Sequence, residues 1–149
     1  MSVVLAALLV ALSGCGLSIP ADPDGTLDRV QGTVLRVGVT PNPSWTVTEP
    51  DLSGTEVDLV RAFADRLDAE VEWQEGSEEA LVTAMERGEL DLLIGGLTAK
   101  SPWMDKVALT APYASSTDDA GVKHDHVMAA PMGENTFLFE LESFLIGKE

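Results

Sequence analysis

Basic residues, cysteines and long apolar segments are all scarce in this 149-residue chain. Nine basic residues stand against 25 acidic ones, so the formal net charge is −16. A surface of this sign repels phosphate backbones and anionic lipid headgroups, which argues against nucleic acid as a partner and against membrane attachment through a basic patch. Cys15 is the only cysteine. An internal disulfide is therefore excluded, and the lone thiol needs another explanation.

The apolar run near the amino terminus is too short to cross a bilayer. Residues 2–12 are uncharged and almost wholly apolar, whereas a transmembrane helix needs about 20 such residues; their length is typical of the apolar centre of a signal peptide. Residues 12–15 read Leu-Ser-Gly-Cys and resemble the lipobox of bacterial lipoproteins, whose cysteine is lipidated. The resemblance implies a signal peptide over 1–14 and an extracytoplasmic chain anchored to the cell membrane by lipidated Cys15. The Pro-, Gly- and Asp-rich residues 15–33 are predicted to be a flexible tether.

From Val34 onward, predicted strands and helices alternate. Strands are expected at 34–39, 71–73, 90–95, 107–113 and 126–130, and helices begin at Thr55, Ser77 and shortly after Gly133. Strand–helix–strand spacing of this kind indicates right-handed βαβ units and a mainly parallel sheet flanked by helices. We therefore predict one α/β domain over residues 34–146.

Polar residues mark the starts of the first two long helices. Thr55 and Asp58 form a variant of the capping box, and Ser77 is a good N-cap for the next helix. Glu56 and Asp58 look functional by charge, but the positive end of the first helix dipole is an adequate explanation for both.

Four segments occur in an order and spacing that point to one family: residues 54–64, 84–92, 96–98 and 110–113. They resemble the amino-acid-type (family 3) bacterial extracellular solute-binding proteins that supply ABC importers. The resemblance implies a periplasmic-binding-protein-like (type II) fold, in which two lobes close over a ligand. Only residues 114–123 separate the exit of the chain near Tyr113 from its return at His126, whereas a second lobe needs roughly 80 to 100 residues. We therefore predict the first lobe alone, with a short hairpin before the returning strand.

The resemblance also implies a set of ligand-binding residues. Thr98 matches the threonine that holds the ligand carboxylate, and Gly95 matches the residue whose carbonyl accepts from the ligand ammonium. Trp103 occupies the position of the carboxylate-clamping arginine, and an indole offers one N–H where a guanidinium offers a planar fork. Lys100 or Lys106 could supply a positive charge, but only as a point charge.

Two tryptophans are expected in loops at the carboxyl ends of the strands, where open α/β sheets bind ligands. Trp45 and Trp103 could sandwich a flat or sugar-like ligand; alternatively, they cap the core or pack against each other. Glu78 stands where many family members have an aromatic residue that stacks on the ligand.

Catalytic, metal and cofactor signals are weak. His124 and His126, with Asp118 and Asp119 nearby, have the residue types of a divalent metal site, but a solvated turn explains them better. No Gly-rich phosphate loop and no nucleophile–base spacing is recognisable in the sequence. We therefore predict a protein that is not an enzyme and has no catalytic residues, no metal and no cofactor.

Three functions follow as hypotheses. The first is a lipid-anchored solute-binding component related to ABC importers, with an open half-site and weak affinity for its solute. The second is an interaction lipoprotein whose cleft face binds a protein, such as an ABC permease. The third is a truncated copy without activity.

Overall fold

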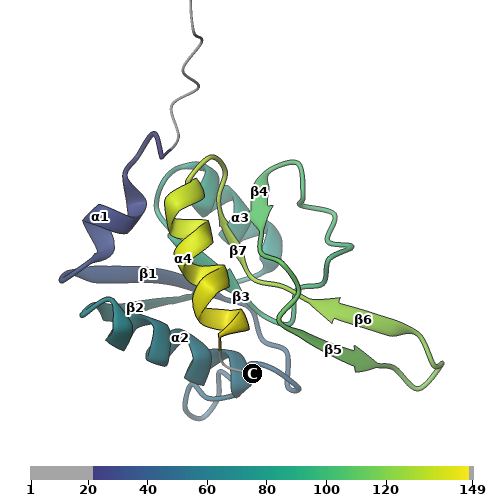
Figure 1. The fold of residues 1–149 in the computed structure, drawn as a ribbon. Coiled ribbons are helices and arrows are strands. Elements are labelled where there is room, and N and C mark those ends of the chain that lie inside the picture. Colours follow the sequence, from purple (N-terminus) through teal and green to yellow (C-terminus); the bar gives the residue numbers. More distant parts are fainter. Residues whose placement is uncertain (1–21, 148–149) are drawn as a thin grey trace, which may run out of the picture.

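The computed structural model describes residues 22–147, which form a five-stranded sheet with helices on both faces and a projecting two-stranded hairpin (Figure 1). The predicted signal peptide and Cys15 lie outside the described residues. The elements in chain order are α1 (Thr26–Val30), β1 (Val34–Val39), α2 (Thr55–Arg66), β2 (Glu70–Glu75), α3 (Glu78–Glu86), β3 (Leu92–Ile94), β4 (Val107–Leu109), β5 (Ala114–Thr117), β6 (Lys123–His126), β7 (Ala129–Pro131) and α4 (Asn135–Ile146). Within this range no helix has the length and apolarity that crossing a membrane requires.

The main sheet has the strand order β2-β1-β3-β7-β4. β1 runs parallel to β2 and to β3, while β7 is antiparallel to both of its neighbours. β4 therefore points the same way as β3, and four of the five strands are parallel. The predicted α/β class with a mainly parallel sheet is confirmed, and the returning strand is the antiparallel one.

Apolar side chains fill two layers, one on each face of the sheet. On one face α1, α2 and α4 pack with Phe63 and Phe137 at the centre. On the other face α3 packs through Leu81 and its neighbours. Successive residues of β3 point alternately to the two layers, as the pleat requires, so this strand has no solvated side.

The two predicted helix starts have different outcomes. Ser77 is the N-cap of α3, and its Oγ accepts a hydrogen bond from the backbone N–H of Ala80 (3.3 Å), as predicted. The prediction of a capping box at Thr55 is wrong: Gly54 is the N-cap of α2, and no side chain caps this helix. A Cβ at position 54 would lie 2.3 Å from the carbonyl oxygen of Trp45, so the close approach of the Trp45 loop selects glycine there.

The hairpin of β5 and β6 stands between the exit and the return of the chain. Ala114 pairs with His126, and Thr117 pairs with Lys123, so the two crossings form one antiparallel ladder. This ladder is a separate sheet, and an isolated bridge between Thr98 and His126 joins its base to the loop after β3. The predicted short hairpin is thereby located: its strands are β5 and β6, and the turn between them spans residues 118–122.

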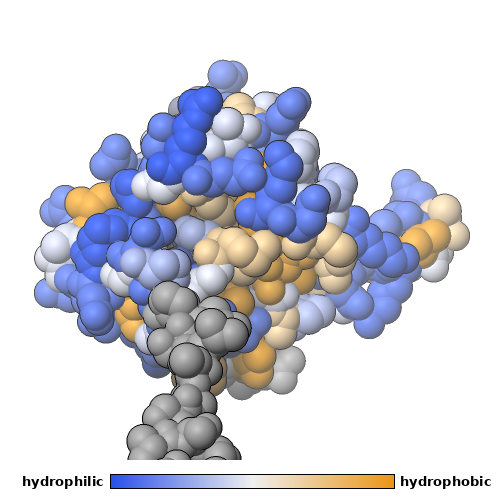
Figure 2. Space-filling view, turned by 90° about the horizontal axis from the view of Figure 1, so that it is seen from above, coloured by the Kyte–Doolittle hydropathy of each residue, from blue (hydrophilic) through white to orange (hydrophobic). Residues whose placement is uncertain are grey.

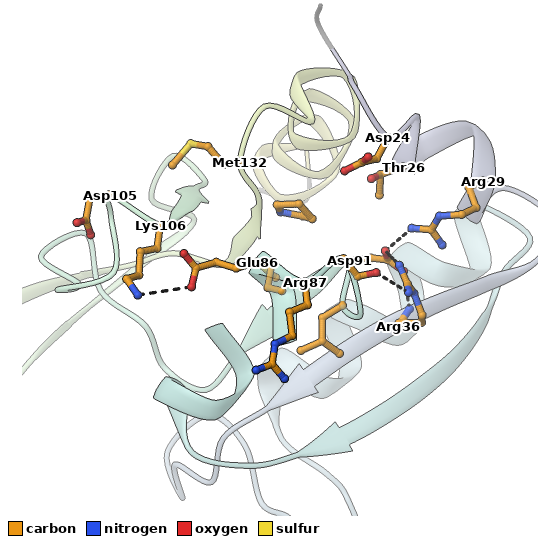
Figure 3. A pocket seen from close by; sticks show the side chains of 14 residues that line it. Asp24, Thr26, Arg29, Arg36, Glu86, Arg87, Asp91, Asp105, Lys106 and Met132 are labelled. Carbon is orange, nitrogen blue, oxygen red and sulfur yellow. Dashed lines mark hydrogen bonds and ion pairs between the residues drawn. The ribbon is translucent and has the colours of Figure 1, made fainter. Parts of the chain in front are cut away.

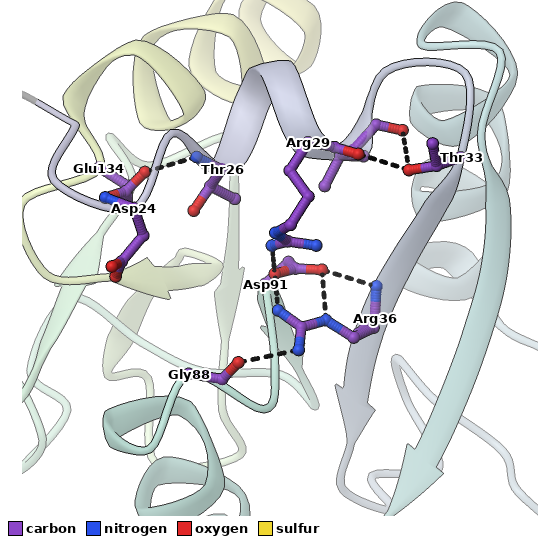
Figure 4. Close-up of polar contacts among 9 residues, drawn as sticks. Asp24, Thr26, Arg29, Thr33, Arg36, Gly88, Asp91 and Glu134 are labelled. Atoms are coloured by element: carbon purple, nitrogen blue, oxygen red, sulfur yellow. Dashed lines mark hydrogen bonds and ion pairs between the residues drawn. The ribbon is translucent and has the colours of Figure 1, made fainter.

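The predicted tether ends earlier than residue 33. The α1 helix forms within it, and Val30 is fully buried in the core. The Glu134 carboxylate accepts hydrogen bonds from the backbone N–H groups of Asp24 (2.8 Å) and Thr26 (2.7 Å) (Figure 4). Asp22 in turn accepts from Thr136 at the start of α4. We call these contacts between residues 22–26 and residues 134–136 the clasp. The partners of Glu134 in it are more than 100 residues away in sequence, so local composition could not predict it.

Candidate functional site

The loops that follow β1 and β3 meet at the carboxyl ends of the parallel strands, the edge where open α/β sheets bind ligands. The Thr40 N–H donates to the Ile94 carbonyl (3.1 Å), and Asn42 Nδ2 donates to the Gly95 carbonyl (3.2 Å). The Thr46 hydroxyl donates to the Thr40 carbonyl (2.6 Å). The Gly95 carbonyl, which the family resemblance assigns to a ligand ammonium, is thus already an acceptor within the protein, with one lone pair left.

A buried carboxylate lies beneath this edge. Glu56, in the first turn of α2, is fully buried, and its Oε2 accepts from the N–H groups of Gly95 (2.8 Å) and Gly96 (2.9 Å). Its Oε1 accepts from the Tyr113 hydroxyl. Burial raises the pKa of Glu56, against the lowering effect of these hydrogen bonds and of nearby His126. Burial and the adjacent carboxylate also raise the pKa of Tyr113. Glu56 therefore ties α2, the loop after β3 and the base of the hairpin together.

The Gly95–Gly96 pair makes this contact sterically possible. A Cβ on Gly95 would lie 2.0 Å from Cγ2 of Thr40. A Cβ on Gly96 would lie 2.3 Å from Nδ2 of Asn42 and 2.8 Å from Cδ1 of Trp45. Both glycines have positive φ angles, of 149° and 69°. Glycine is required at both positions because the φ angles are positive and because a Cβ at either would collide with side chains of the loop after β1.

Trp45 packs on a histidine at the base of the hairpin. The ring centroids of Trp45 and His126 are 3.9 Å apart at 37°, and Tyr113 meets the indole edge-on at 6.5 Å. His126 is 4% exposed, and its Nε2 lies 2.7 Å from the Ser116 hydroxyl. Its Nδ1 is buried and has no hydrogen-bond partner in the described part of the chain. Trp45 thus closes the junction between the sheet and the hairpin.

The two residues that depart from the family pattern contact each other. Trp103 Nε1 donates to Glu78 Oε2 (3.0 Å), and the indole packs against the apolar layer under α3. The one N–H that the indole could offer a ligand is therefore engaged. Trp45 and Trp103 make no ring contact with each other among residues 22–147, so the alternative in which they pack together is wrong.

The remaining predicted positions differ in exposure. Thr98 is half-buried, its backbone bridges to His126, and its hydroxyl makes no hydrogen bond with any described residue. Lys100 is exposed and forms no ion pair with the described residues. The structure therefore brings Gly95, Trp45 and Thr98 together at one edge, with His126 between them, and places Trp103 beside Glu78 at the start of α3.

The histidine-rich turn holds one ion pair. His124 Nε2 lies 2.9 Å from Oδ2 of Asp118, and this hydrogen bond is the main cause of the lowered pKa of Asp118. Among the described residues no three His, Cys, Asp or Glu side chains are placed to hold a metal ion.

Sequence reasoning explained Glu56 by the helix dipole and His126 by a solvated turn, and it gave the side chain of Tyr113 no role in the site. For Glu56 a usable signal existed, because it lies 4, 7 and 11 residues before the buried apolar residues Val60, Phe63 and Leu67 of α2. An acid on the apolar stripe of a helix is buried with that stripe, whereas an acid that only complements the helix dipole is exposed. Tyr113 and His126 carry no comparable local pattern.

One cavity lies at the opposite end of the sheet. It measures about 680 Å³ and is lined by residues at the amino ends of β1, β3 and β4, with Arg36, Arg87 and Asp91 among them (Figure 3). In a two-lobed binding protein the ligand lies in the cleft between the lobes. A single lobe supplies only one wall of that cleft, so we expect no enclosed cavity at the carboxyl edge. Geometry and residue types therefore identify the candidate site.

Comparison with known proteins identifies the family to which the chain belongs. The family model of bacterial extracellular solute-binding proteins, family 3, matches residues 35–144. The chain is 26% identical over 118 residues to a probable histidine-binding protein of Campylobacter jejuni, with 75% of this chain and 46% of that protein covered. It is 34% identical over 113 residues to membrane-bound lytic murein transglycosylase F of Idiomarina loihiensis, with 74% and 25% covered. The chain thus spans less than half the length of either relative.

A solved structure matches over nearly its whole length. The arginine-bound form of domain 1 from TmArgBP, the ArgBP of T. maritima, superimposes with a TM-score of 0.67 at 23% identity. The match covers 82% of this chain and 96% of that domain. This likeness shows the fold, and the part of this chain that matches corresponds to one lobe.

Proposed function

Because the chain belongs to family 3 of the bacterial extracellular solute-binding proteins, we propose that it binds a small solute at the carboxyl edge of its sheet and delivers it to an ABC permease. The observation that carries the proposal is the meeting of Gly95, Trp45 and Thr98 at that edge, with the Thr98 hydroxyl unengaged among the described residues. We infer a role in binding and not in catalysis: the Ser116 hydroxyl lies 2.7 Å from Nε2 of His126, but among the described residues no acid orients Nδ1 of that imidazole.

The chemistry of the edge favours a neutral or cationic solute. No arginine stands at the position of the family's carboxylate clamp, and the indole N–H of Trp103 is engaged by Glu78. Lys100 is the one cation among the proposed ligand residues, and it is exposed. The net charge of −16 adds a long-range repulsion of anions. A solute held by hydroxyl, carbonyl and aromatic groups fits these residues better than a free carboxylate does.

One lobe leaves the solute open on one side. With no second wall to close over it, we expect dissociation constants in the micromolar to millimolar range, about −4 to −8 kcal/mol. The arginine-bound form of domain 1 from TmArgBP supports binding of a solute by a single lobe.

Isothermal titration of the protein with amino acids, polyamines and sugars tests the proposal. We expect at least one solute to bind, and the Thr98→Ala variant to bind it about tenfold more weakly because a hydroxyl hydrogen bond is lost. Thr83→Ala is the matched control, since Thr83 bonds only within α3. Absence of binding by the whole panel would contradict the proposal, and submicromolar binding by the monomer would contradict the open half-site.

We also propose that Cys15 carries a lipid anchor on the extracytoplasmic side of the membrane. The support is the Leu-Ser-Gly-Cys sequence at 12–15 and the lone cysteine. Two or more acyl chains, at about 0.8 kcal/mol per buried CH₂, hold a protein on a bilayer stably. Metabolic labelling with palmitate should mark the wild-type protein and leave the Cys15→Ala variant unlabelled and in the soluble fraction. Equal labelling of both proteins would contradict the anchor.

A further inference from the structure

The amino-terminal part of the described chain enters the fold at one defined place. Asp22 donates its backbone N–H to the Gly133 carbonyl (3.1 Å), and its carboxylate accepts from the backbone N–H of Thr136. Gly133 lies in the short loop between β7 and α4, which Figure 1 draws at the top of the molecule. Residues 1–21 are therefore attached beside this loop, at the end of the sheet that holds the amino ends of β1 and β3.

Two large apolar side chains are exposed near this point of attachment. Met132 directly precedes Gly133 and is 53% exposed, and Met104, in the loop that leads into β4, is 56% exposed. Asp105 and Lys106, which follow Met104, line the same cavity as Met132. Figure 2 looks down on this end of the molecule and shows an apolar area within a mainly hydrophilic surface. We call Met104 and Met132 the methionine pair.

Charge is balanced at this end, unlike in the rest of the chain. Four of the nine basic residues and four of the 25 acidic residues line the cavity here, which leaves five basic against 21 acidic residues elsewhere. An acidic protein that approaches an anionic bilayer is repelled least when its least acidic side faces the lipid. The charge distribution therefore favours an orientation in which the amino ends of the strands point toward the membrane.

The proposed lipid anchor is attached at the same end. Cys15 precedes Asp22 by seven residues, and seven residues span at most about 25 Å whatever their conformation. A lipidated Cys15 would therefore hold the loop between β7 and α4 within about 25 Å of the headgroups. A short tether gives the nearby surface a high effective concentration at the bilayer, so weak apolar contacts become populated.

We propose that the methionine pair is a membrane-docking surface, which inserts into the headgroup region of the bilayer that carries the lipidated Cys15. The proposal rests on the lipid anchor proposed above and adds an orientation to it. Methionine side chains are flexible and adapt to an irregular apolar surface such as lipid. In the docked orientation the carboxyl edge, at the opposite end of the sheet, faces away from the membrane and is open to solutes.

Hydroxyl-radical footprinting of the full chain, followed by mass spectrometry, tests this surface. Methionine oxidises readily, so both members of the pair report their own exposure. In isolated membranes we expect Met104 and Met132 to oxidise at least about fivefold more slowly than in the soluble Cys15→Ala variant, because insertion into the headgroup region excludes water. Val122→Met is the matched control, since position 122 is exposed at the turn of the hairpin. The side chain at position 122 should oxidise equally fast with and without Cys15→Ala.

Met132→Ser separates the apolar contact from the tether. Met132 is exposed, so this variant should fold, and Met104 should oxidise about threefold faster in it than in the membrane-bound wild type because half of the apolar contact is lost. Unchanged protection of Met104 in Met132→Ser would overturn the docking surface. So would equal oxidation of the pair in membrane-bound and soluble protein, or equal protection at position 122.

Palmitate labelling of the same samples distinguishes failure of the docking surface from failure of the anchor. A labelled, membrane-bound wild type whose methionine pair is unprotected would leave the anchor standing and overturn the docking surface alone. A wild type that palmitate does not label would overturn both.

Discussion

Removal of the buried carboxylate of Glu56 should destabilise the whole carboxyl edge. In the Glu56→Ala variant the N–H groups of Gly95 and Gly96 lose their acceptor, and the Tyr113 hydroxyl loses its own. An unsatisfied buried donor costs about 1–3 kcal/mol. Because Gly96 is only half-buried, we expect a loss of about 3 kcal/mol in the free energy of unfolding. That is a large fraction of the roughly 5–15 kcal/mol typical of a domain.

The Glu56→Gln variant tests the charge of this side chain separately. Glutamine keeps the shape and can accept from both glycine N–H groups, but it does not titrate. Burial raises the pKa of Glu56 above its value of 4.5, so over the interval between the unfolded and folded pKa values the folded state binds more protons than the unfolded state. Stability from Glu56 is therefore complete below about pH 4.5 and is lost as the pH rises through the folded pKa. Relative to Glu56→Gln, the wild type should become less stable as the pH rises.

Urea unfolding followed by tryptophan fluorescence and circular dichroism, at several pH values, measures both effects. Asp58→Asn is the matched control: Asp58 lies in the same helical turn but is exposed and pairs with Arg61 at 3.6 Å, so its loss should cost less than about 1 kcal/mol. A loss below about 1 kcal/mol for Glu56→Ala would refute the account of this carboxylate. A wild-type advantage over Glu56→Gln that grows with pH would refute the direction of its pKa.

Three further variants test other parts of the structure. Asp91→Asn should lower the free energy of unfolding by about 2 kcal/mol, since two partly exposed arginines lose their shared carboxylate; a change within experimental error in urea unfolding would contradict that. Gly95→Ala should lose about 3 kcal/mol or fail to fold, because its Cβ would collide with Thr40, and a wild-type melting curve would show that the loops can separate. Glu134→Ala should expose α1 to hydrogen exchange and proteolysis, because two N–H groups lose their acceptor; unchanged protection of residues 22–30 would mean that the clasp is dispensable.

Periodicity was enough to predict the layers of this fold. The apolar spacing in α2 and α4 and the apolar run of β3 place these elements in the core, and the structure buries Phe63, Phe137 and Ile94 accordingly. The strand–helix alternation also predicted the parallel part of the sheet. These features are local, because a few consecutive residues decide which face of an element is buried.

The features that were not predicted from the sequence depend on contacts between distant segments. Glu134 binds the start of α1, which turned a predicted tether into a folded segment. His126 meets Trp45 through a ring contact across some 80 residues of sequence. Trp103 donates a hydrogen bond to Glu78, although the sequence analysis had interpreted these two residues separately. No spacing rule contains such information, since each contact depends on how the finished elements lie beside one another.

The central claim, that solute binds at the carboxyl edge of the sheet, is tested most directly by amide chemical shifts. A titration of ¹⁵N-labelled protein with a solute that binds in the calorimetric screen would report on both ends of the sheet at once. Our account predicts the largest shifts at residues 95–98 and at Trp45, with small ones at residues 87–91. Shifts concentrated at residues 87–91, with residues 95–98 unmoved, would contradict it.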